Sequence, residues 1–102
     1  MSTALTRTEI LDRLREHESE LHRRGVTRVA LFGSAARGEA RADSDIDLMV
    51  EIDPAARIGV FQYAGIVNYL QDLFPAGVDV AERNGLKKLV KPNVERDAVY
   101  AF

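Results

Sequence analysis

The sequence predicts an α/β fold, of the α+β type, in which a small β-sheet of about three strands is flanked by helices. Two segments repeat apolar residues at steps of three and four, as amphipathic helices do. Three short segments are rich in β-branched residues, as strands are. The two kinds of segment alternate along the chain, which is typical of a sheet covered by helices. Periodicity leaves open whether the strands run parallel or in both directions.

Length and composition bound the class of protein. The 102 residues suit one domain, residues 1–102, with one core, and a content of 46% hydrophobic and 29% charged residues is typical of a globular fold. The formal net charge of −2 gives no support to a broad basic surface, so no direct nucleic-acid binding is expected. Without cysteine there is no disulfide and no thiolate metal site.

The hydropathy of the chain gives no support to a membrane protein. No apolar run approaches the ~20 residues needed to cross a bilayer. The first residues lack the apolar stretch of a secretory signal. We therefore expect a cytoplasmic protein.

The first helix is predicted from about residue 7 to residue 23. Thr6 and Glu9 have the spacing of a capping box, and Thr8 is an alternative cap. Basic residues followed by Gly25 mark the end of this helix. The apolar face consists of Ile10, Leu11, Leu14 and Leu21.

The first strand is predicted over residues 26–32, which alternate in polarity and are rich in β-branched residues. Gly33 and Ser34 end it, and Ser34 is a candidate cap for a helical turn over residues 35–37. Residues 38–44 are predicted as a loop.

The second strand is predicted over residues 45–52 and ends at Asp53-Pro54. Alternation divides it into two faces. Ile46, Leu48 and Val50 face one side, and Asp45, Asp47 and Met49 face the other.

Residues 58–74 predict a second long helix, packed on the sheet. Its apolar positions are Ile58, Phe61, Ala64, Val67, Leu70 and Phe74. With Phe61, Tyr63 and Tyr69, it has more aromatic residues than one face needs. Core packing is the favoured use of these residues, and contact with a partner is the alternative.

The last third of the chain is predicted as short elements. Residues 75–77 form a turn and residues 78–81 a short third strand. Asn84-Gly85 breaks the chain. Short helices are expected over residues 86–90 and 94–100, the second with Asn93 as its cap.

Three aspartates lie in or next to the predicted strands. Asp45 and Asp47 are two residues apart, so a strand turns both side chains to one face. Asp79 stands between two valines, although aspartate is a poor strand former. If the third strand lies beside the second, the three carboxylates can share one face. Such a cluster could hold one or two Mg²⁺ ions for phosphoryl transfer.

The aspartates also have an ordinary structural interpretation. Asp45 could cap a turn, Asp47 could be a solvated strand residue, and Asp79 could pair with a lysine or arginine. Asp-x-Asp is a short pattern that often arises by chance, and on spacing alone the two interpretations have about equal weight. Asp43 is interpreted as a solvated or turn residue.

The Gly33-Ser34 turn is a place where the backbone can approach a phosphate, with the Ser34 hydroxyl as a donor. Arg37 lies one turn further on, within reach of the same phosphates. The alternatives are a common strand terminator for Gly-Ser and a surface position for Arg37, and the surface position is favoured on this evidence alone.

Together these residues resemble a known signature. Gly33-Ser34, ten intervening residues and Asp45-x-Asp47 are similar to the signature of the DNA polymerase β-like nucleotidyltransferase superfamily. The string from Phe32 to Val50 resembles its minimal nucleotidyltransferase branch, and Val78-Asp79-Val80 matches the position of the third carboxylate. Residues 86–100 resemble the closing helices of that family.

The resemblance implies the fold of this superfamily, with a small mixed sheet, and a set of site residues. Asp45, Asp47 and Asp79 are implied as the catalytic and metal-binding acids, and Asp79 is the best candidate for a general base. Gly33, Ser34 and Arg37 are implied as nucleotide-binding residues.

The resemblance also implies a function. Members of the minimal branch are antitoxins that use Mg²⁺ and ATP to transfer AMP to a tyrosine of a HEPN-family RNase toxin, with which they form a heteromeric complex. Two alternatives stay open. One is an antitoxin that neutralises the toxin by binding alone. The other is a small-molecule nucleotidyltransferase, which ranks lowest because the chain has no added acceptor-binding region.

Overall fold

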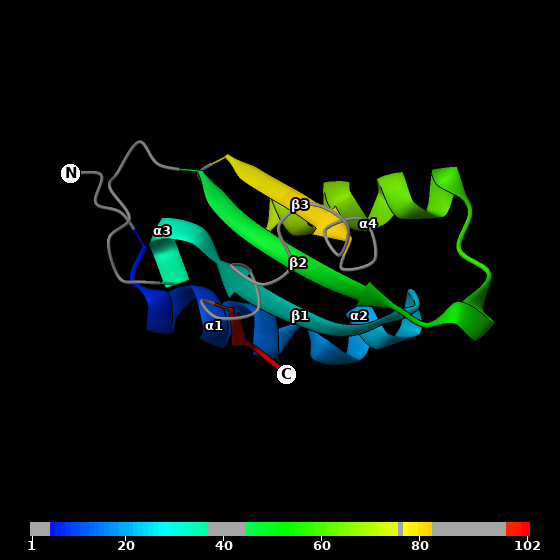
Figure 1. Cartoon of the computed structure of the whole chain (residues 1–102), viewed down its shortest axis with the longest axis horizontal. Helices are drawn as coiled ribbons and strands as arrows, with labels where there is room; N and C mark the ends of the chain where they lie inside the picture. Colours follow the sequence, from blue (N-terminus) through cyan, green and yellow to red (C-terminus); the bar gives the residue numbers. More distant parts are fainter. Residues whose placement is uncertain (1–4, 37–44, 76, 83–97) are drawn as a thin grey trace.

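In residues 5–36, 45–75, 77–82 and 98–102, which a computed structural model describes, four strands form one sheet with helices packed against it (Figure 1). The helices are α1 (Arg7–Glu16), α2 (Glu18–Arg23), α3 (Gly33–Ala36), the 3-10 turn η1 (Pro54–Ala56) and α4 (Val60–Asp72). The strands are β1 (Val26–Phe32), β2 (Ile46–Ile52), β3 (Val78–Glu82) and β4 (Val99–Tyr100).

The strand order across the sheet is β3-β2-β1-β4. β1 runs antiparallel to both β2 and β4, whereas β2 and β3 run parallel. The sheet is therefore mixed, and the predicted class of a small sheet flanked by helices is confirmed. The parallel pair matters most for the site, because it sets the first residues of β2 and β3 side by side.

The prediction of about three strands and a closing helix over residues 94–100 is wrong at the end of the chain. Val99 and Tyr100 form β4, which pairs with Leu31 and Ala30 of β1. A β-branched and an aromatic residue suit a strand, and the pairing covers the otherwise open edge of β1. The rest of that helix, and the one predicted over residues 86–90, lie outside the described residues.

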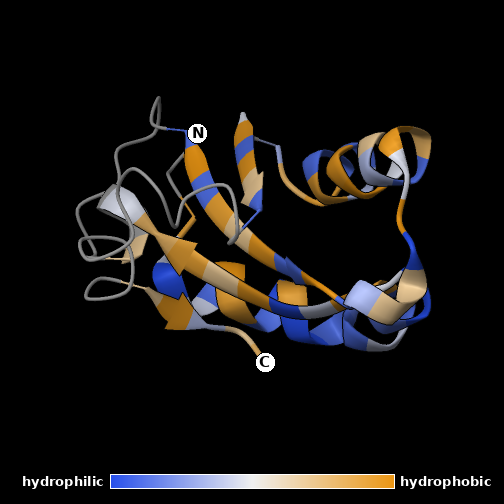
Figure 2. Cartoon of the chain, turned by 45° about the vertical axis from the view of Figure 1, so that its right-hand side comes forward, coloured by the Kyte–Doolittle hydropathy of each residue, from blue (hydrophilic) through white to orange (hydrophobic). Residues whose placement is uncertain are grey.

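One face of the sheet packs on the helices to form the main core. Alternation in β1 and β2 sends Val29, Leu31, Leu48 and Val50 into it, and all four are fully buried. α1 and α2 turn their apolar side toward the sheet and their hydrophilic side outward (Figure 2). From these helices the core receives Ile10, Leu11, Leu14 and Leu21, as predicted.

The helix predicted over residues 7–23 is interrupted at His17, which ends α1 and precedes α2. The Thr6–Glu9 capping box at its start is confirmed: Glu9 N–H donates to Thr6 Oγ1 at 3.1 Å and Thr6 N–H donates to Glu9 Oε1 at 3.0 Å. His17 Nδ1 lies 2.6 Å from the Tyr69 hydroxyl of α4. This hydrogen bond ties the interruption to the neighbouring helix.

The face predicted for the second long helix is partly wrong. Leu70 and Phe74 are buried as expected, and Ile66 is buried as well, but Phe61 is 90% exposed and Ala64 is exposed. The first turns of α4 extend past the ends of β2 and β3, so neither of these strands lies beneath them (Figure 1).

In the described parts of the chain, no helix combines the length and apolar character of a membrane span.

Candidate active site

The two strands β2 and β3 position the predicted acids. In their parallel register Asp47 lies directly opposite Asp79. Asp45 comes immediately before β2 and two residues before Asp47, which puts it on the same side. The N–H of Ile46 donates to the carbonyl of Gly77 at 2.8 Å and fixes the start of β2 against β3. The third strand therefore lies beside the second, as a shared face for the three aspartates requires.

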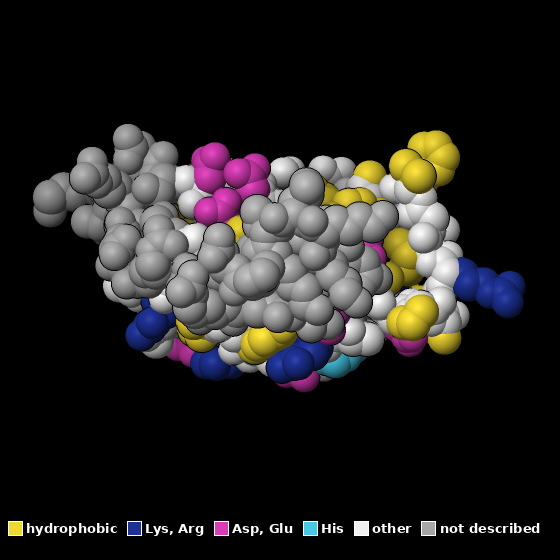
Figure 3. All heavy atoms as spheres, in the orientation of Figure 1, with side chains coloured by type: hydrophobic (Ala, Val, Ile, Leu, Met, Phe, Trp, Pro, Cys, Tyr) yellow, Lys and Arg dark blue, Asp and Glu magenta, His cyan; other side chains and the backbone are white. Residues whose placement is uncertain are grey.

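The other face of β2 explains why this register holds. Ile46, Leu48 and Val50 alternate with the acids and are buried in the core. A slip of one residue would exchange them with the acids, which burial of apolar side chains forbids. Packing on one face therefore presents the acids on the other, and acidic side chains gather over the first residues of β2 and β3 (Figure 3).

The acids interact electrostatically. Asp47 is partly buried, whereas Asp45 and Asp79 are exposed. Burial raises the pKa of the Asp47 carboxyl above its usual value, and the negative charges of Asp79 and then Asp45 raise it further. A cation placed among these carboxylates would remove both the repulsion and much of the desolvation penalty.

Gly33 approaches this cluster from the end of β1. Its φ is +74°, which an L side chain rarely adopts. A Cβ at this position would collide with Oδ2 of Asp47. Glycine is therefore needed here both for the turn and for the space beside the carboxylate.

Gly77 has a similar relation to Asp45, which the sequence analysis missed. A Cβ on Gly77 would lie 2.6 Å from Asp45 Oδ1 and 3.5 Å from Asp45 Cγ. In the sequence Gly77 reads only as part of a turn. Its closeness to Asp45 depends on the pairing of β2 with β3, and no local pattern reveals it.

The remaining predicted residues are placed less fully. Ser34 lies in α3, which begins at Gly33, one residue before the cap predicted for this turn. The role of its hydroxyl stays a prediction. Arg37, Asp43 and the loop predicted over residues 38–44 lie outside the described residues.

The donor set suits a hard divalent cation, since all three side chains are carboxylates. As they stand, no three acidic, histidine or cysteine side chains in the described part of the chain are close enough to hold one ion. A bound cation would draw the carboxylates together by removing the repulsion between their charges. Asp45, Asp47 and Asp79 are the residues that fit this role.

Comparison with known proteins agrees with this geometry. Residues 9–101 match the family model described as the nucleotidyltransferase domain. The chain is 35% identical over 97 residues to a protein of Thermococcus cleftensis named protein adenylyltransferase MntA, covering 94% of this chain and 96% of the relative.

Solved structures share the fold. One, assigned provisionally as a minimal nucleotidyltransferase, has a TM-score of 0.70 and 35% identity, covering 87% of this chain and 93% of the other. A second belongs to a toxin–antitoxin crystallised with AMP-PNP, with a TM-score of 0.66 at 19% identity, covering 96% and 73% of the two chains. The chain thus belongs to the nucleotidyltransferase domain family and is a minimal nucleotidyltransferase.

Proposed function

We propose that this nucleotidyltransferase is a Mg²⁺-dependent protein adenylyltransferase, which transfers AMP from ATP to a tyrosine of a HEPN-family toxin and thereby acts as its antitoxin. The observation that carries the proposal is the parallel register that sets Asp79 opposite Asp47. Asp45 and Gly33 lie beside the same cluster. Such a cluster at the end of a sheet suits a metal-assisted phosphoryl transfer.

The chemistry is a displacement at the α-phosphorus of ATP. The tyrosine oxygen forms a bond to this phosphorus, the bond from the phosphorus to the bridging oxygen breaks, and diphosphate leaves. Asp45, Asp47 and Asp79 would hold Mg²⁺, which stabilises the negative charge that develops on the phosphate oxygens. Asp79, whose side chain is exposed, would accept the tyrosine proton.

Gly33 and Ser34 would hold the triphosphate of ATP. The turn at Gly33 has no side chain, so a phosphate can come close to its backbone. Ser34, directly after it in α3, would donate its hydroxyl to a phosphate oxygen, and Arg37 would add a positive charge.

The proposed acceptor has two supports. The Thermococcus cleftensis relative, 35% identical over nearly the whole chain, is named a protein adenylyltransferase. The same fold also occurs in a toxin–antitoxin crystallised with AMP-PNP.

The test uses the protein encoded by the adjacent gene, which the proposal identifies as the HEPN-family toxin, incubated with the purified chain, ATP and Mg²⁺. Mass spectrometry should find one or more AMP groups on a tyrosine of that protein. The Asp45→Ala, Asp47→Ala double variant should leave it unmodified, and Asp72→Ala, which removes an exposed carboxylate at the end of α4, should behave like wild type.

Identical spectra for wild type and the double variant would refute the proposal. A double variant that transfers no AMP but still protects cells fully from the toxin would show that neutralisation depends on binding alone.

A further inference from the structure

The first residue of α1 contacts the helical turn that follows β1. Arg7 Nη1 donates a hydrogen bond to the carbonyl oxygen of Ala36 at 3.0 Å. Ala36 is the last residue of α3, which lies beside the start of α1 at the end of the sheet where the acids gather (Figure 1). The two residues are 29 positions apart in the sequence, so this contact forms only when the chain folds.

α3 depends on contacts of this kind because it is a single helical turn. It has four residues, Gly33–Ala36, and a helix of this length has almost no stability of its own. The carbonyls at the end of a helix have no partners within the helix, and Arg7 satisfies one of them. The Ala36 side chain is buried in the core beside Ile10 and Leu11 of α1. α1 therefore holds α3 at its last residue.

The backbone of Arg7 is itself well ordered. Arg7 directly follows the N-cap Thr6, whose capping box with Glu9 closes the first turn of α1. Because this turn is already fixed, the hydrogen bond to Ala36 restricts only the side chain of Arg7.

The residues proposed to bind the triphosphate are in α3 or directly attached to it. Gly33, with its φ of +74°, begins α3, and Ser34 follows. The carbonyl that accepts from Arg7 belongs to the peptide bond that precedes Arg37. A contact at this carbonyl can therefore influence all three nucleotide-binding positions.

We propose that Arg7 is a positioning residue for nucleotide binding, which keeps α3 in the conformation that receives the triphosphate of ATP. The inference rests on the nucleotide-binding role proposed above for Gly33 and Ser34. Without the hydrogen bond, α3 has to become ordered when ATP binds, and this ordering weakens the binding. The acids are fixed by the pairing of β2 with β3, so the transfer itself proceeds at the normal rate.

The test is a calorimetric titration of the chain with Mg²⁺ and α,β-methylene ATP, an analogue whose AMP cannot be transferred. Arg7→Met keeps the apolar stem and removes the donors, so it should raise the Kd about fivefold. Arg7→Lys keeps a donor and should recover most of the affinity. In steady-state AMP transfer, Arg7→Met should raise the KM for ATP by the same factor and leave kcat unchanged. Arg7 is exposed, so the fold should tolerate both substitutions.

Arg15→Met is the matched control. Arg15 lies on the same helix and also donates to a backbone carbonyl, with Nε 2.8 Å from the oxygen of Ala101. Ala101 follows β4 and donates its N–H to Val29, in the middle of β1 and four residues before Gly33. This variant should lose stability in urea as Arg7→Met does, because each loses one hydrogen bond of the same kind, but it should keep the Kd of wild type.

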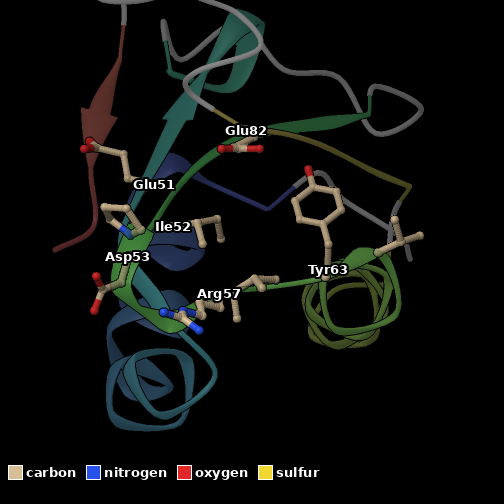
Figure 4. A pocket seen from close by; sticks show the side chains of 10 residues that line it. Glu51, Ile52, Asp53, Arg57, Tyr63 and Glu82 are labelled. Carbon is tan, nitrogen blue, oxygen red and sulfur yellow. The ribbon is translucent and has the colours of Figure 1, made fainter.

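A second control addresses another location for the nucleotide. A cleft of about 610 Å³ lies at the other end of β2, between its last residues and the start of α4 (Figure 4). Its volume is within the ~300–1,000 Å³ common for ligand sites. Val60→Ala removes an exposed side chain from its lining and should leave the Kd unchanged. A Kd that Val60→Ala raises and Arg7→Met does not would assign the nucleotide to the cleft and overturn the inference.

Hydrogen exchange separates positioning from direct contact with a phosphate. In the nucleotide-free protein, Arg7→Met should speed the exchange of the α3 amides, and Arg15→Met should not. Unchanged exchange in Arg7→Met together with weakened binding would mean that Arg7 contacts ATP itself, which overturns the positioning role.

The remaining outcomes separate this inference from the proposed function. Wild type that does not bind the analogue overturns the nucleotide-binding role of α3 and the inference about Arg7 with it. Wild type that binds the analogue but transfers no AMP to the acceptor overturns the proposed acceptor alone, and a raised Kd in Arg7→Met still supports the positioning role. An unchanged Kd in Arg7→Met, or an equal rise in Arg15→Met, overturns the inference about Arg7 alone.

Discussion

At the scale of single residues, Asp47 is where the acidic cluster destabilises the fold. Its pKa is raised by burial and by Asp79 and Asp45, whereas the unfolded chain has the ordinary value. The folded protein therefore binds the Asp47 proton more tightly than the unfolded chain does. The tighter proton binding stabilises the fold. This stabilisation is fully present when the pH is below the Asp47 pKa of the unfolded chain, and it is lost as the pH rises through the raised Asp47 pKa of the folded protein.

Asp47→Asn should accordingly raise the melting temperature of the metal-free protein near neutral pH. The gain should shrink toward zero below about pH 3, where the carboxyl is protonated in wild type too. Thermal unfolding in a chelator at several pH values measures both effects. Added Mg²⁺ should stabilise wild type but not the variant. A variant less stable than wild type at neutral pH would contradict this account of the cluster.

Gly33 and Gly77 should respond differently to alanine, although each touches one of the acids. At Gly33 the positive φ adds strain of roughly 1–2 kcal/mol, so Gly33→Ala should lose both stability and activity. Gly77 has no such φ, so Gly77→Ala should unfold like wild type while Asp45 is displaced.

For Gly77→Ala we expect activity to fall about tenfold or more, because small displacements at a reacting centre have large effects on rate. The Mg²⁺ concentration for half-maximal activity should rise with it. Chemical denaturation and a Mg²⁺ titration of AMP transfer separate the two effects. Unchanged Mg²⁺ dependence would show that Asp45 rotates away without consequence.

These residues also show which features of the site could be predicted from the sequence. Spacing alone predicted that Asp45 and Asp47 share a side, and the Gly-Ser turn drew attention to Gly33. Whether Asp79 lies beside them depends on the pairing of β3 with β2, which the sequence alone does not establish. Gly77 was missed because contact with Asp45 is a property of two paired strands.

At the scale of elements, the junction of α1 and α2 depends on α4. The Tyr69 hydroxyl is 2.6 Å from His17 Nδ1, and the guanidinium of Arg24 lies 4.6 Å from the centre of the Tyr69 ring. Tyr69 thus contacts residues on both sides of α2. The helical period of the sequence continues through His17, so the interruption could not be predicted from it.

Tyr69→Phe should remove the hydrogen bond and keep the ring under Arg24. The expected loss is about 1 kcal/mol in the free energy of unfolding, measured by urea denaturation. In the background of His17→Ala the same substitution should have little further effect. Equal losses in both backgrounds would mean that the hydroxyl stabilises the fold by another contact.

The other two errors at this scale have tertiary causes as well. β4 is only two residues long and has no period to detect, yet Tyr100 packs under the Arg28 guanidinium at 3.8 Å, and the next residue, Ala101, donates its N–H to the Val29 carbonyl at 2.8 Å. Phe61 fits the apolar period of its helix but lies beyond the strands that would bury it. Periodicity predicts a face and not how far the neighbouring element extends.

At the scale of the whole molecule, the acids and the η1 turn lie at opposite ends of β2, so a change at one end should leave the other unaffected. Arg57 tests this separation. It is the non-glycine residue of positive φ, 52°, in the described part of the chain. It follows η1 and has an exposed side chain.

Arg57→Gly should stabilise the fold, as measured by urea denaturation, and leave AMP transfer unchanged. Glycine adopts the left-handed conformation without the strain of a side chain, so stability should rise by about 1 kcal/mol. The KM for ATP should not change, because Arg57 is at the far end of the sheet from Asp47. A variant that is less stable than wild type, or that has a changed KM for ATP, would contradict the separation of the two ends.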